Sequence, residues 1–305
     1  MSKSWVSLWG SEQVCVCAVC VCKTADWLLS QTKHRPQVAI ICGSGLGMLA
    51  DALKCQDAFH YTDIPGFPQS TVQGHAGRLV FGELKGKTCV CMQGRFHMYE
   101  GHSLCKTTFP VRVFKLLGVE TLIVTNAAGS LADGLKPGDI MIIKDHVNFP
   151  GLGGFNPLNG PNDDKFGPRF PAMSACYNPG LRCLAMDIAK QQGVAELVQE
   201  GVYAAVGGPN FETIAEAKLM HRLGVDAVGT PRTHTHTHTH THTHTHTHSH
   251  FGGVYFDLHS FPGDPDPNND HDIPNPNPSP SPNPNPNPNL NLILNLFMTL
   301  TLNLA

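Results

Sequence analysis

Short, uninterrupted apolar runs bounded by proline or glycine set the strongest limit on how this chain can fold. Val38–Cys42 lies between Pro36 and Gly43, and Thr121–Asn126 is a second run of the same kind. Runs of this length without polar alternation are typical of strands that are covered on both faces. Amphipathic segments such as Leu181–Gln192 predict helices between them. We therefore expect an α/β fold with a mixed central sheet flanked by helices.

Further segments continue this pattern. We expect strands at Leu79–Leu84, Thr88–Met92, Asp139–Ile143, Gly201–Val206 and Asp226–Gly229, and helices at Thr24–Gln31, Leu46–Leu53, Phe109–Leu117 and Thr213–Leu223. The first two of these strands should pair through Lys85-Gly86, and Thr213-Ile-Ala-Glu216 is a capping box that starts the last helix. The strand at Asp226 is cut off after Gly229, so we expect the C-terminal part of the sheet to be missing.

The composition excludes several classes of protein. The 305 residues carry a formal net charge of −3, so we expect no basic surface and no nucleic-acid partner. No apolar run reaches the roughly 18 residues of a membrane-spanning helix, and the N-terminus lacks the pattern of a signal peptide. Seven of the eleven cysteines are scattered through strand-like or helical sequence, as in a reduced intracellular protein. These features predict a cytoplasmic protein without a membrane partner.

Repetitive sequence occupies both ends of the chain. Cys15-Val-Cys-Ala-Val-Cys-Val-Cys22 consists of cysteines separated by valine and alanine, and Thr233–His250 alternates threonine and histidine almost throughout. Translation of a two-base GT/AC repeat gives both patterns, and the Asn-Pro and Asn-Leu runs near the C-terminus resemble another short-unit repeat. We interpret both ends as translated non-coding sequence. The predicted boundaries are an aberrant N-terminus at 1–22, a central domain at 23–230 and a low-complexity tail at 231–305.

The tail is expected to be disordered. Threonine-histidine repeats lack an apolar face, and asparagine-proline repeats remove backbone donors and disfavour helix. We expect nothing in Thr233–Asn289 to cover the open sheet edge, while the alternating leucines of Leu290–Ala305 could form one strand. A metal-binding function would rest only on the repeated histidines and cysteines, so we expect no metal site.

The segment Gln93–Gly101 gives the first indication of function. It follows a predicted strand and brings together Arg95, His97, Tyr99 and Glu100. In an extended run the first three would point to one side. A guanidinium and an imidazole on one side suit an oxyanion such as phosphate, although an ordinary polar loop with a helix-starting glutamate would have the same sequence.

Two glycine-rich turns add to this site. Gly43-Ser-Gly-Leu-Gly47 follows a strand and precedes a helix-like segment, so its backbone donors and the Ser44 hydroxyl could hold a phosphate. The glycine spacing fits neither a dinucleotide fingerprint nor a Walker loop. His75, in the loop Gly74-His-Ala-Gly-Arg78, could cover the same site or be structural.

Five motifs in order and spacing resemble the trimeric, vertebrate-type purine nucleoside phosphorylases. They are Ile41–Gly47, Gly74–Arg78, Met92–Gly101, Val124-Thr-Asn-Ala-Ala-Gly129 and Gly208-Pro-Asn-Phe-Glu-Thr213. The resemblance runs from about Lys23 to Gly229. It implies a homotrimer that cleaves purine ribonucleosides and deoxyribonucleosides, such as inosine and guanosine, to free base and (deoxy)ribose 1-phosphate in purine salvage.

The resemblance also implies roles for individual residues. Phosphate would be held by Ser44, Arg95, His97 and the backbone of Ala127, with His75 covering it. Glu212 would hold the ring N–H of the purine, Phe211 would pack against the base, and Tyr99 would contact the sugar. Tyr203 would line the base pocket and Phe170 would reach a neighbouring subunit's site, although both could instead pack in a core. His97 and Glu212 are the catalytic candidates, and the reaction needs no cofactor because inorganic phosphate is a co-substrate.

The sequence departs from the family after Gly229. A Met-Ser pair, an asparagine that donates to the leaving purine, a ribose-binding histidine and a closing helix should follow there, whereas this chain has Thr230-Pro-Arg and the repeats. Two interpretations of residues 23–230 as a truncated nucleoside phosphorylase domain stay open. One is an active phosphorylase, and the other is an inactive remnant that at most binds phosphate or joins a trimer.

Overall fold

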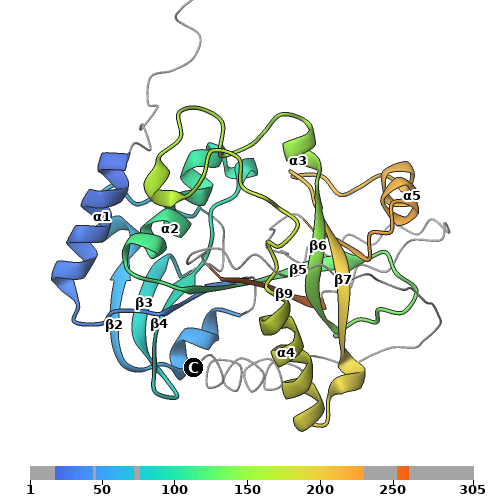
Figure 1. Cartoon of the computed structure of the whole chain (residues 1–305), viewed down its shortest axis with the longest axis horizontal. Helices are drawn as coiled ribbons and strands as arrows, with labels where there is room; N and C mark the ends of the chain where they lie inside the picture. The colour runs from blue at the N-terminus through green and yellow to red at the C-terminus, as the bar shows by residue number, and fades with distance from the viewer. Residues whose placement is uncertain (1–17, 44–45, 72–75, 230–252, 261–305) are drawn as a thin grey trace, which may run out of the picture.

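The structure, a computed structural model, describes residues 18–43, 46–71, 76–229 and 253–260. Its strands are β1 (Val38–Cys42), β2 (Lys54–His60), β3 (Arg78–Leu84), β4 (Lys87–Gln93), β5 (Thr121–Ser130), β6 (Ile140–Asn148), β7 (Val198–Ala205), β8 (Ala227–Gly229) and β9 (Gly253–Ser260). Its α-helices are α1 (Ala18–Gln31), α2 (Leu104–Leu116), α3 (Phe149–Leu152), α4 (Pro179–Gln191) and α5 (Ile214–Arg222), as Figure 1 shows.

The described strands form one mixed sheet in the order β2-β3-β4-β1-β5-β8-β7-β6-β9, with a further pairing between β5 and β9. At its centre β1 pairs in parallel with both β4 and β5. β3 and β4 form an antiparallel hairpin, whose turn residues Lys85 and Gly86 have φ values of 46° and 84°. These positive values are typical of a tight hairpin turn. The predicted mixed α/β fold and the predicted hairpin are confirmed.

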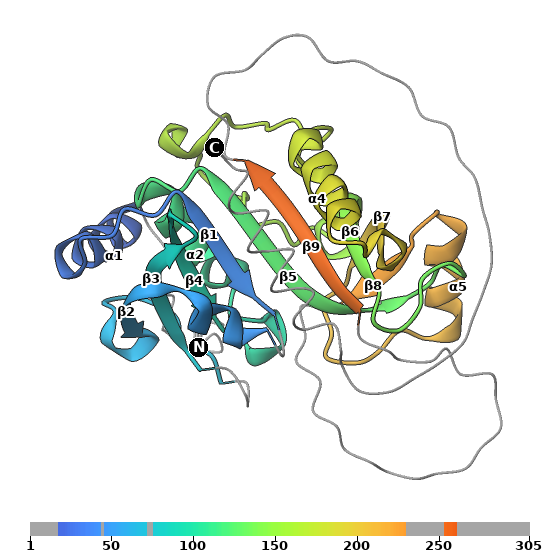
Figure 2. The same ribbon diagram turned by 90° about the horizontal axis from the view of Figure 1, so that it is seen from below.

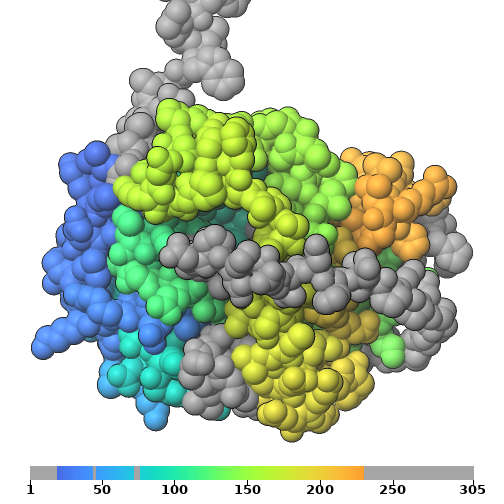
Figure 3. Space-filling view, viewed as in Figure 1, coloured from blue at the N-terminus to red at the C-terminus, as the bar shows by residue number. Residues whose placement is uncertain are grey.

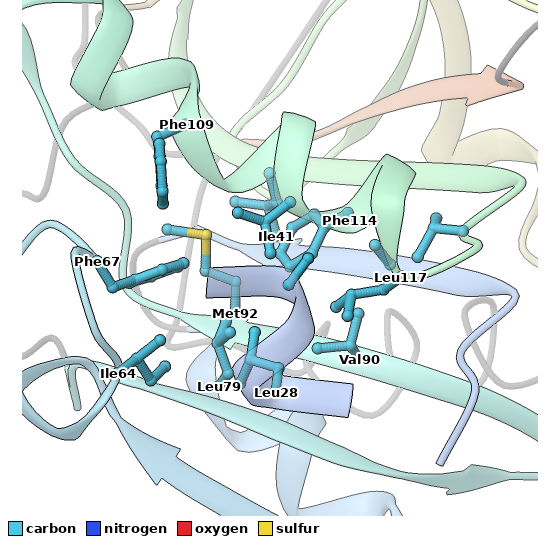
Figure 4. Close-up of a cluster of buried hydrophobic side chains, with 14 of the residues drawn as sticks. Leu28, Ile41, Ile64, Phe67, Leu79, Val90, Met92, Phe109, Phe114 and Leu117 are labelled. Carbon is cyan, nitrogen blue, oxygen red and sulfur yellow. The ribbon is translucent and has the colours of Figure 1, made fainter. Parts of the chain in front are cut away.

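Apolar side chains alternate between the two faces of the sheet, as expected for strands. Leu79 and Phe81 of β3 pack with α1 and α2, in a cluster that includes Phe109 and Phe114 (Figure 4). Val80 points to the opposite face, where Ile188 of α4 belongs to the same buried cluster. Helices thus cover both faces of the central strands, which explains the uninterrupted apolar sequence of β1.

Five strands close on themselves. β5 pairs with β9, β9 with β6, β6 with β7, β7 with β8, and β8 with β5. Figure 2 shows β9 running alongside β5, with α4 next to it. Our expectation that nothing in Thr233–Asn289 covers the open sheet is therefore wrong, because Gly253–Ser260 pairs with both β5 and β6.

Other differences from the sequence-based expectations concern element boundaries. α1 begins at Ala18 rather than Thr24, so the boundary predicted at residue 22 lies inside a helix with Val21 fully buried. α2 begins five residues early, at Leu104, where Ser103 accepts a hydrogen bond from the Lys106 amide. The helix expected at 46–53 is a 3₁₀ helix, Gly47–Ala52. The other 3₁₀ helices are Tyr61–Asp63, Met98–Glu100, Asp164–Phe166 and Ala195–Leu197.

No helix in the described part of the chain has both the length and the apolar character that a membrane crossing requires. The segment between β6 and α4 contains only short helices. It forms the upper surface of the molecule in Figure 3.

Candidate functional site

The ends of β1 and β4 meet the middle of β5 at one place, and Arg95 lies there. Two residues after β4, Arg95 donates through Nη2 to the carbonyl oxygen of Thr125 in β5. Gly43, which directly follows β1, donates its amide to Thr125 Oγ1 at 2.9 Å. A Cβ on Gly43 would lie 2.6 Å from Arg95 Nη2 and 2.9 Å from Asn126 Cα. Only glycine therefore permits this close approach.

Arg95 supplies a positive charge that no carboxylate neutralises among the described residues. Burial lowers the pKa of Arg95, and the nearby hydroxyl and thiol groups of Tyr203, Cys42 and Tyr99 oppose that shift. An arginine nevertheless stays protonated in proteins. A partly buried cation without a counter-charge favours an anionic ligand, because the local dielectric is lower than that of water.

His97 is held beside Arg95 by a carboxylate. Its side chain is 2% exposed, and Nδ1 lies 2.7 Å from Glu100 Oε1, which also accepts from the His97 amide at 2.9 Å. The ring stacks on Tyr99 with a centroid distance of 4.7 Å and an interplanar angle of 17°. The imidazole is thus fixed on one edge by Glu100 and on one face by Tyr99.

Glu100 is itself fixed by the chain preceding the site. Its Oε2 accepts from both the amide and the hydroxyl of Thr71, each at 2.7 Å. Burial opposes ionisation, but the hydrogen bonds from Thr71 and His97 outweigh it and lower the pKa of Glu100. An ionised Glu100 favours a His97 ring whose Nδ1 carries a proton.

The backbone of Ala127 lies on the strand that Arg95 contacts. Alternate residues of a strand direct their amides and carbonyls to the same edge. The Thr125 carbonyl accepts from Arg95, so the Ala127 amide, two residues later, is expected on the Arg95 side. β9 pairs along β5 through this region without a register shift. The arrangement suits an amide that shares an anion with Arg95.

Tyr203 comes from β7 and closes another side of this group. Its ring is 8% exposed, and its hydroxyl donates to Asn126 Oδ1 at 3.1 Å. The Tyr203 hydroxyl also lies where a Cβ on Gly229 would be, so β8 packs directly against it. Tyr203 thus packs beside the β5 residues next to Thr125, and it also belongs to a buried cluster with Ala128, Met141 and Tyr177, as the core-packing alternative expected.

Phe211 and Glu212 lie in the loop between β7 and α5, where they line a pocket of about 400 Å³. The remaining lining residues are Phe149, Val206, Gly207, Gly208, Asn210, Glu216, Leu219 and Met220. Phe211 is 47% exposed, as an aromatic ring offered to a ligand would be. Apart from Phe149, the lining residues lie between Val206 and Met220, so the predicted base residues belong to the segment that follows β7.

Three predicted site residues are not part of this group. Phe170 is 88% exposed and lies beneath the guanidinium of Arg169, with 5.7 Å between Arg169 Cζ and the ring centroid. Core packing is therefore excluded for Phe170 within the chain. Ser44 and His75 lie outside the described residues.

Sequence reasoning missed the partners that hold the site together. The interpretation of Glu100 as a helix-starting residue is confirmed by its capping box with His97 at the start of the 3₁₀ helix Met98–Glu100, but its contact with the His97 ring was not expected. The three-residue spacing from His97 to Glu100 was the available signal. Asn126 and Thr71 carry no comparable signal, because their roles depend on contacts between distant segments. Among the described residues, no group of three or more His, Cys, Asp or Glu side chains could hold a metal ion.

Comparison with known proteins agrees with this arrangement. The sequence model of the family described as "Phosphorylase superfamily" matches residues 37–230. The chain belongs to this superfamily. The match starts just before β1 and ends just after β8, so it contains every residue of the candidate site.

Individual relatives narrow the family to purine nucleoside phosphorylases. The mouse enzyme of that name is 63% identical over 206 residues, which cover 68% of this chain and 71% of the mouse protein. The bovine enzyme is 61% identical over the same shares of both chains. A crystal structure of the Schistosoma mansoni enzyme in complex with inosine superposes with a TM-score of 0.74 at 37% identity, covering 96% of this chain and 99% of that one. The predicted vertebrate-type family is confirmed.

Proposed function

We propose that the chain catalyses phosphorolysis of purine ribonucleosides and deoxyribonucleosides, such as inosine and guanosine. The observation that carries the proposal is Arg95 at the junction of β1, β4 and β5, which has no carboxylate partner among the residues that the structure describes. Arg95 and the Ala127 amide offer donors that a phosphate dianion needs. With Nδ1 on Glu100, His97 adds a donor at Nε2 when its ring is the imidazolium. The identity with purine nucleoside phosphorylases supplies the substrate class.

The reaction follows from holding phosphate in place. A phosphate oxygen forms a bond to the anomeric carbon of the sugar as the bond from that carbon to the purine breaks. The purine leaves with the electron pair and is then protonated, giving free base and sugar 1-phosphate. The sugar passes through a cationic, oxocarbenium-like state, and a dianion held by Arg95 is both nucleophile and counter-charge.

The pocket beside α5 suits the base. Glu212 can accept a hydrogen bond from a purine ring N–H, and Phe211 offers an aromatic surface for stacking. A glutamate acceptor favours 6-oxopurines such as hypoxanthine and guanine, which carry that N–H. Tyr99 stacks on His97, and the resemblance assigns it to the sugar, which is bonded to both the base and the attacking phosphate.

Three further features belong to the proposal. The reaction requires no metal or organic cofactor, because phosphate is itself the second substrate. The protein is a cytoplasmic homotrimer. Phe170, an 88% exposed aromatic side chain, is available to enter a neighbouring subunit's site.

A second candidate is a family member that binds phosphate without turning over nucleoside. One observation favours it: the family match ends at residue 230, just before the threonine-histidine repeat begins at Thr233. The expected donor to the leaving purine lies beyond that point in the resembling enzymes. The two candidates differ in turnover and share phosphate binding.

A single preparation of the full chain distinguishes them. Incubation with inosine should release hypoxanthine when phosphate is present and none when phosphate is omitted. Calorimetric titration of the same preparation with phosphate measures binding independently. Phosphate binding without hypoxanthine release would favour the second candidate, and neither binding nor release would contradict both.

A further inference from the structure

The space between β5 and β6 is occupied by a strand that is distant in sequence. β8 ends at Gly229, and residues 230–252 separate it from β9. Val228 of β8 pairs with Gly129 of β5, and Gly253 of β9 pairs with Ala128, the β5 residue that precedes Gly129. β8 and β9 therefore pair with consecutive parts of the same edge of β5, although they are distant from each other in sequence.

The pairing is extensive on both sides of β9. Along β5 it is antiparallel and continuous from Thr121, opposite Ser260, to Ala128, opposite Gly253. Along β6 it is parallel, from Ile140 opposite Val254 to Ile142 opposite Phe256. A segment that pairs on both edges is an interior strand, and without it the edges of β5 and β6 would lack partners.

The sequence of the segment suits that position. In Gly-Val-Tyr-Phe-Asp-Leu-His-Ser, the apolar residues Val254, Phe256 and Leu258 alternate with Tyr255, Asp257 and His259. This two-residue period, rich in branched and aromatic residues, is typical of a strand. On either side lie threonine-histidine and asparagine-proline repeats, which have no such pattern.

The side chains of β5 and β6 on either side of β9 are also apolar and buried, as expected next to an interior strand. Ile123 of β5 and both Ile140 and Ile142 of β6 belong to one buried cluster, together with Ile188 of α4. β5 and β6 do not pair with each other in the described sheet. One buried apolar cluster therefore extends from β5 to β6, past the place between them that β9 occupies.

We propose that the space between β5 and β6 is a strand-acceptor site for an extended peptide with alternating apolar residues, and that the chain fills it with its own residues 253–260. Backbone hydrogen bonds to two edges supply the binding, and the apolar alternation supplies the register. The connection 230–252 allows this in cis, because loop-closure entropy rises only slowly with loop length.

Occupation of this site also supports the candidate active site. β9 pairs with β5 through Thr125, Asn126 and Ala127, opposite Phe256, Tyr255 and Val254. These β5 residues contact Arg95 and Tyr203 or carry the amide assigned to phosphate. The acceptor site takes its strand from beyond residue 230, where the match to the family model ends.

A cross-linking experiment tests the register in the full chain. Thr121 and Ser260 are directly opposite, and both can be replaced by cysteine with little change in size. The pair Thr121→Cys/Ser260→Cys should form a disulfide on mild oxidation, identified by peptide mapping against the native cysteines. The control pair Thr121→Cys/His259→Cys is shifted by one residue, which directs the second side chain to the other face. Equal yields from both pairs, or none from either, would overturn the proposal.

Mixing isotope-labelled and unlabelled protein before oxidation shows which chain supplies the strand. Cross-links within one isotopic form support occupation in cis. Cross-links that join labelled to unlabelled peptides in the statistical proportion would overturn it and indicate exchange between copies. Because this test uses pairing alone, its outcome is independent of phosphorolysis.

A second experiment measures binding to the acceptor site. Phe256→Pro in the full chain removes a backbone donor from the middle of β9. Amide exchange along Leu122–Ala128 should become at least about tenfold faster, while β3 and β4 stay protected. The matched control Phe251→Pro changes the same residue type outside the pairing and should leave exchange unchanged. Adding the octapeptide 253–260 should restore protection in the Phe256→Pro chain, and a scrambled octapeptide should not. Unchanged exchange in Phe256→Pro, or equal effects of both peptides, would contradict the proposal.

Discussion

Replacing Glu100 with glutamine should destabilise the protein through the contacts of both carboxylate oxygens. Oε1 accepts from the amide and Nδ1 of His97, and Oε2 accepts from the amide and hydroxyl of Thr71. An amide can accept on its oxygen only, so two of these four donors would face an NH₂ group. Hydrogen bonds to a charged group contribute about 1.5–3 kcal/mol each. Taking the lower end, because the Thr71 contacts are exposed, Glu100→Gln should reduce the free energy of unfolding by about 3 kcal/mol.

Urea unfolding of the full chain at pH 7 measures this loss. The pKa of Glu100 is lowered in the folded state, so its contribution to stability is present above the unfolded carboxyl pKa. It is lost as the pH falls through the folded pKa. The difference between wild type and Glu100→Gln should therefore be full at pH 7 and shrink below about pH 4.

Glu216→Gln is the matched control. Glu216 also accepts a hydrogen bond from a backbone amide, that of Thr213, but it is exposed at the start of α5, where glutamine can replace glutamate in a capping box. Its effect should be much smaller than that of Glu100→Gln. A change below about 1 kcal/mol for Glu100→Gln, or equal changes in both variants, would refute the reasoning from hydrogen-bond geometry.

The remaining predictions address the site and the core. Arg95→Ala should weaken phosphate binding at least ~10²-fold in calorimetric titration and nucleoside binding far less, and equal losses would contradict its assignment to the anion. Glu212→Gln should do the reverse, because an amide accepts more weakly from a ring N–H; an unchanged nucleoside affinity would remove Glu212 from the base site. Tyr203→Phe leaves the buried Asn126 without its hydroxyl donor and should cost about 1–3 kcal/mol in urea unfolding. Phe109→Ala, at a side chain only 2% exposed, should cost about 3–5 kcal/mol, and a loss below 1 kcal/mol would contradict its place in the core.

Strands with a continuous or strictly local signal were predictable from the sequence. β1 has five buried residues in a row and stands between proline and glycine, so its apolar run was sufficient. β2 was missed because Lys54–His60 is an edge strand with mostly exposed side chains and no apolar run. β9 was missed because its alternation spans only eight residues between repeats. Its partners, β5 and β6, are more than a hundred residues away in sequence.

The sequence was sufficient to predict which residues form the site. It was less informative about the hydrogen-bond partners that hold those residues in place. Arg95, His97 and Tyr99 were identified from their spacing, and the structure brings them together. The arginine's partner on β5 was not predictable, because a backbone carbonyl has no sequence signal. Glu100 had a signal in its spacing from His97, but its second contact, to Thr71, depends on a loop 29 residues away.

Phosphorus NMR of the full chain with inosine and inorganic phosphate tests the central claim most directly. The account predicts that inorganic phosphate disappears and a sugar 1-phosphate resonance appears, in a one-to-one ratio with hypoxanthine measured by its ultraviolet absorbance. Hypoxanthine released without consumption of phosphate would mean hydrolysis rather than phosphorolysis. A spectrum unchanged by the protein would contradict the claim that this chain is an active purine nucleoside phosphorylase.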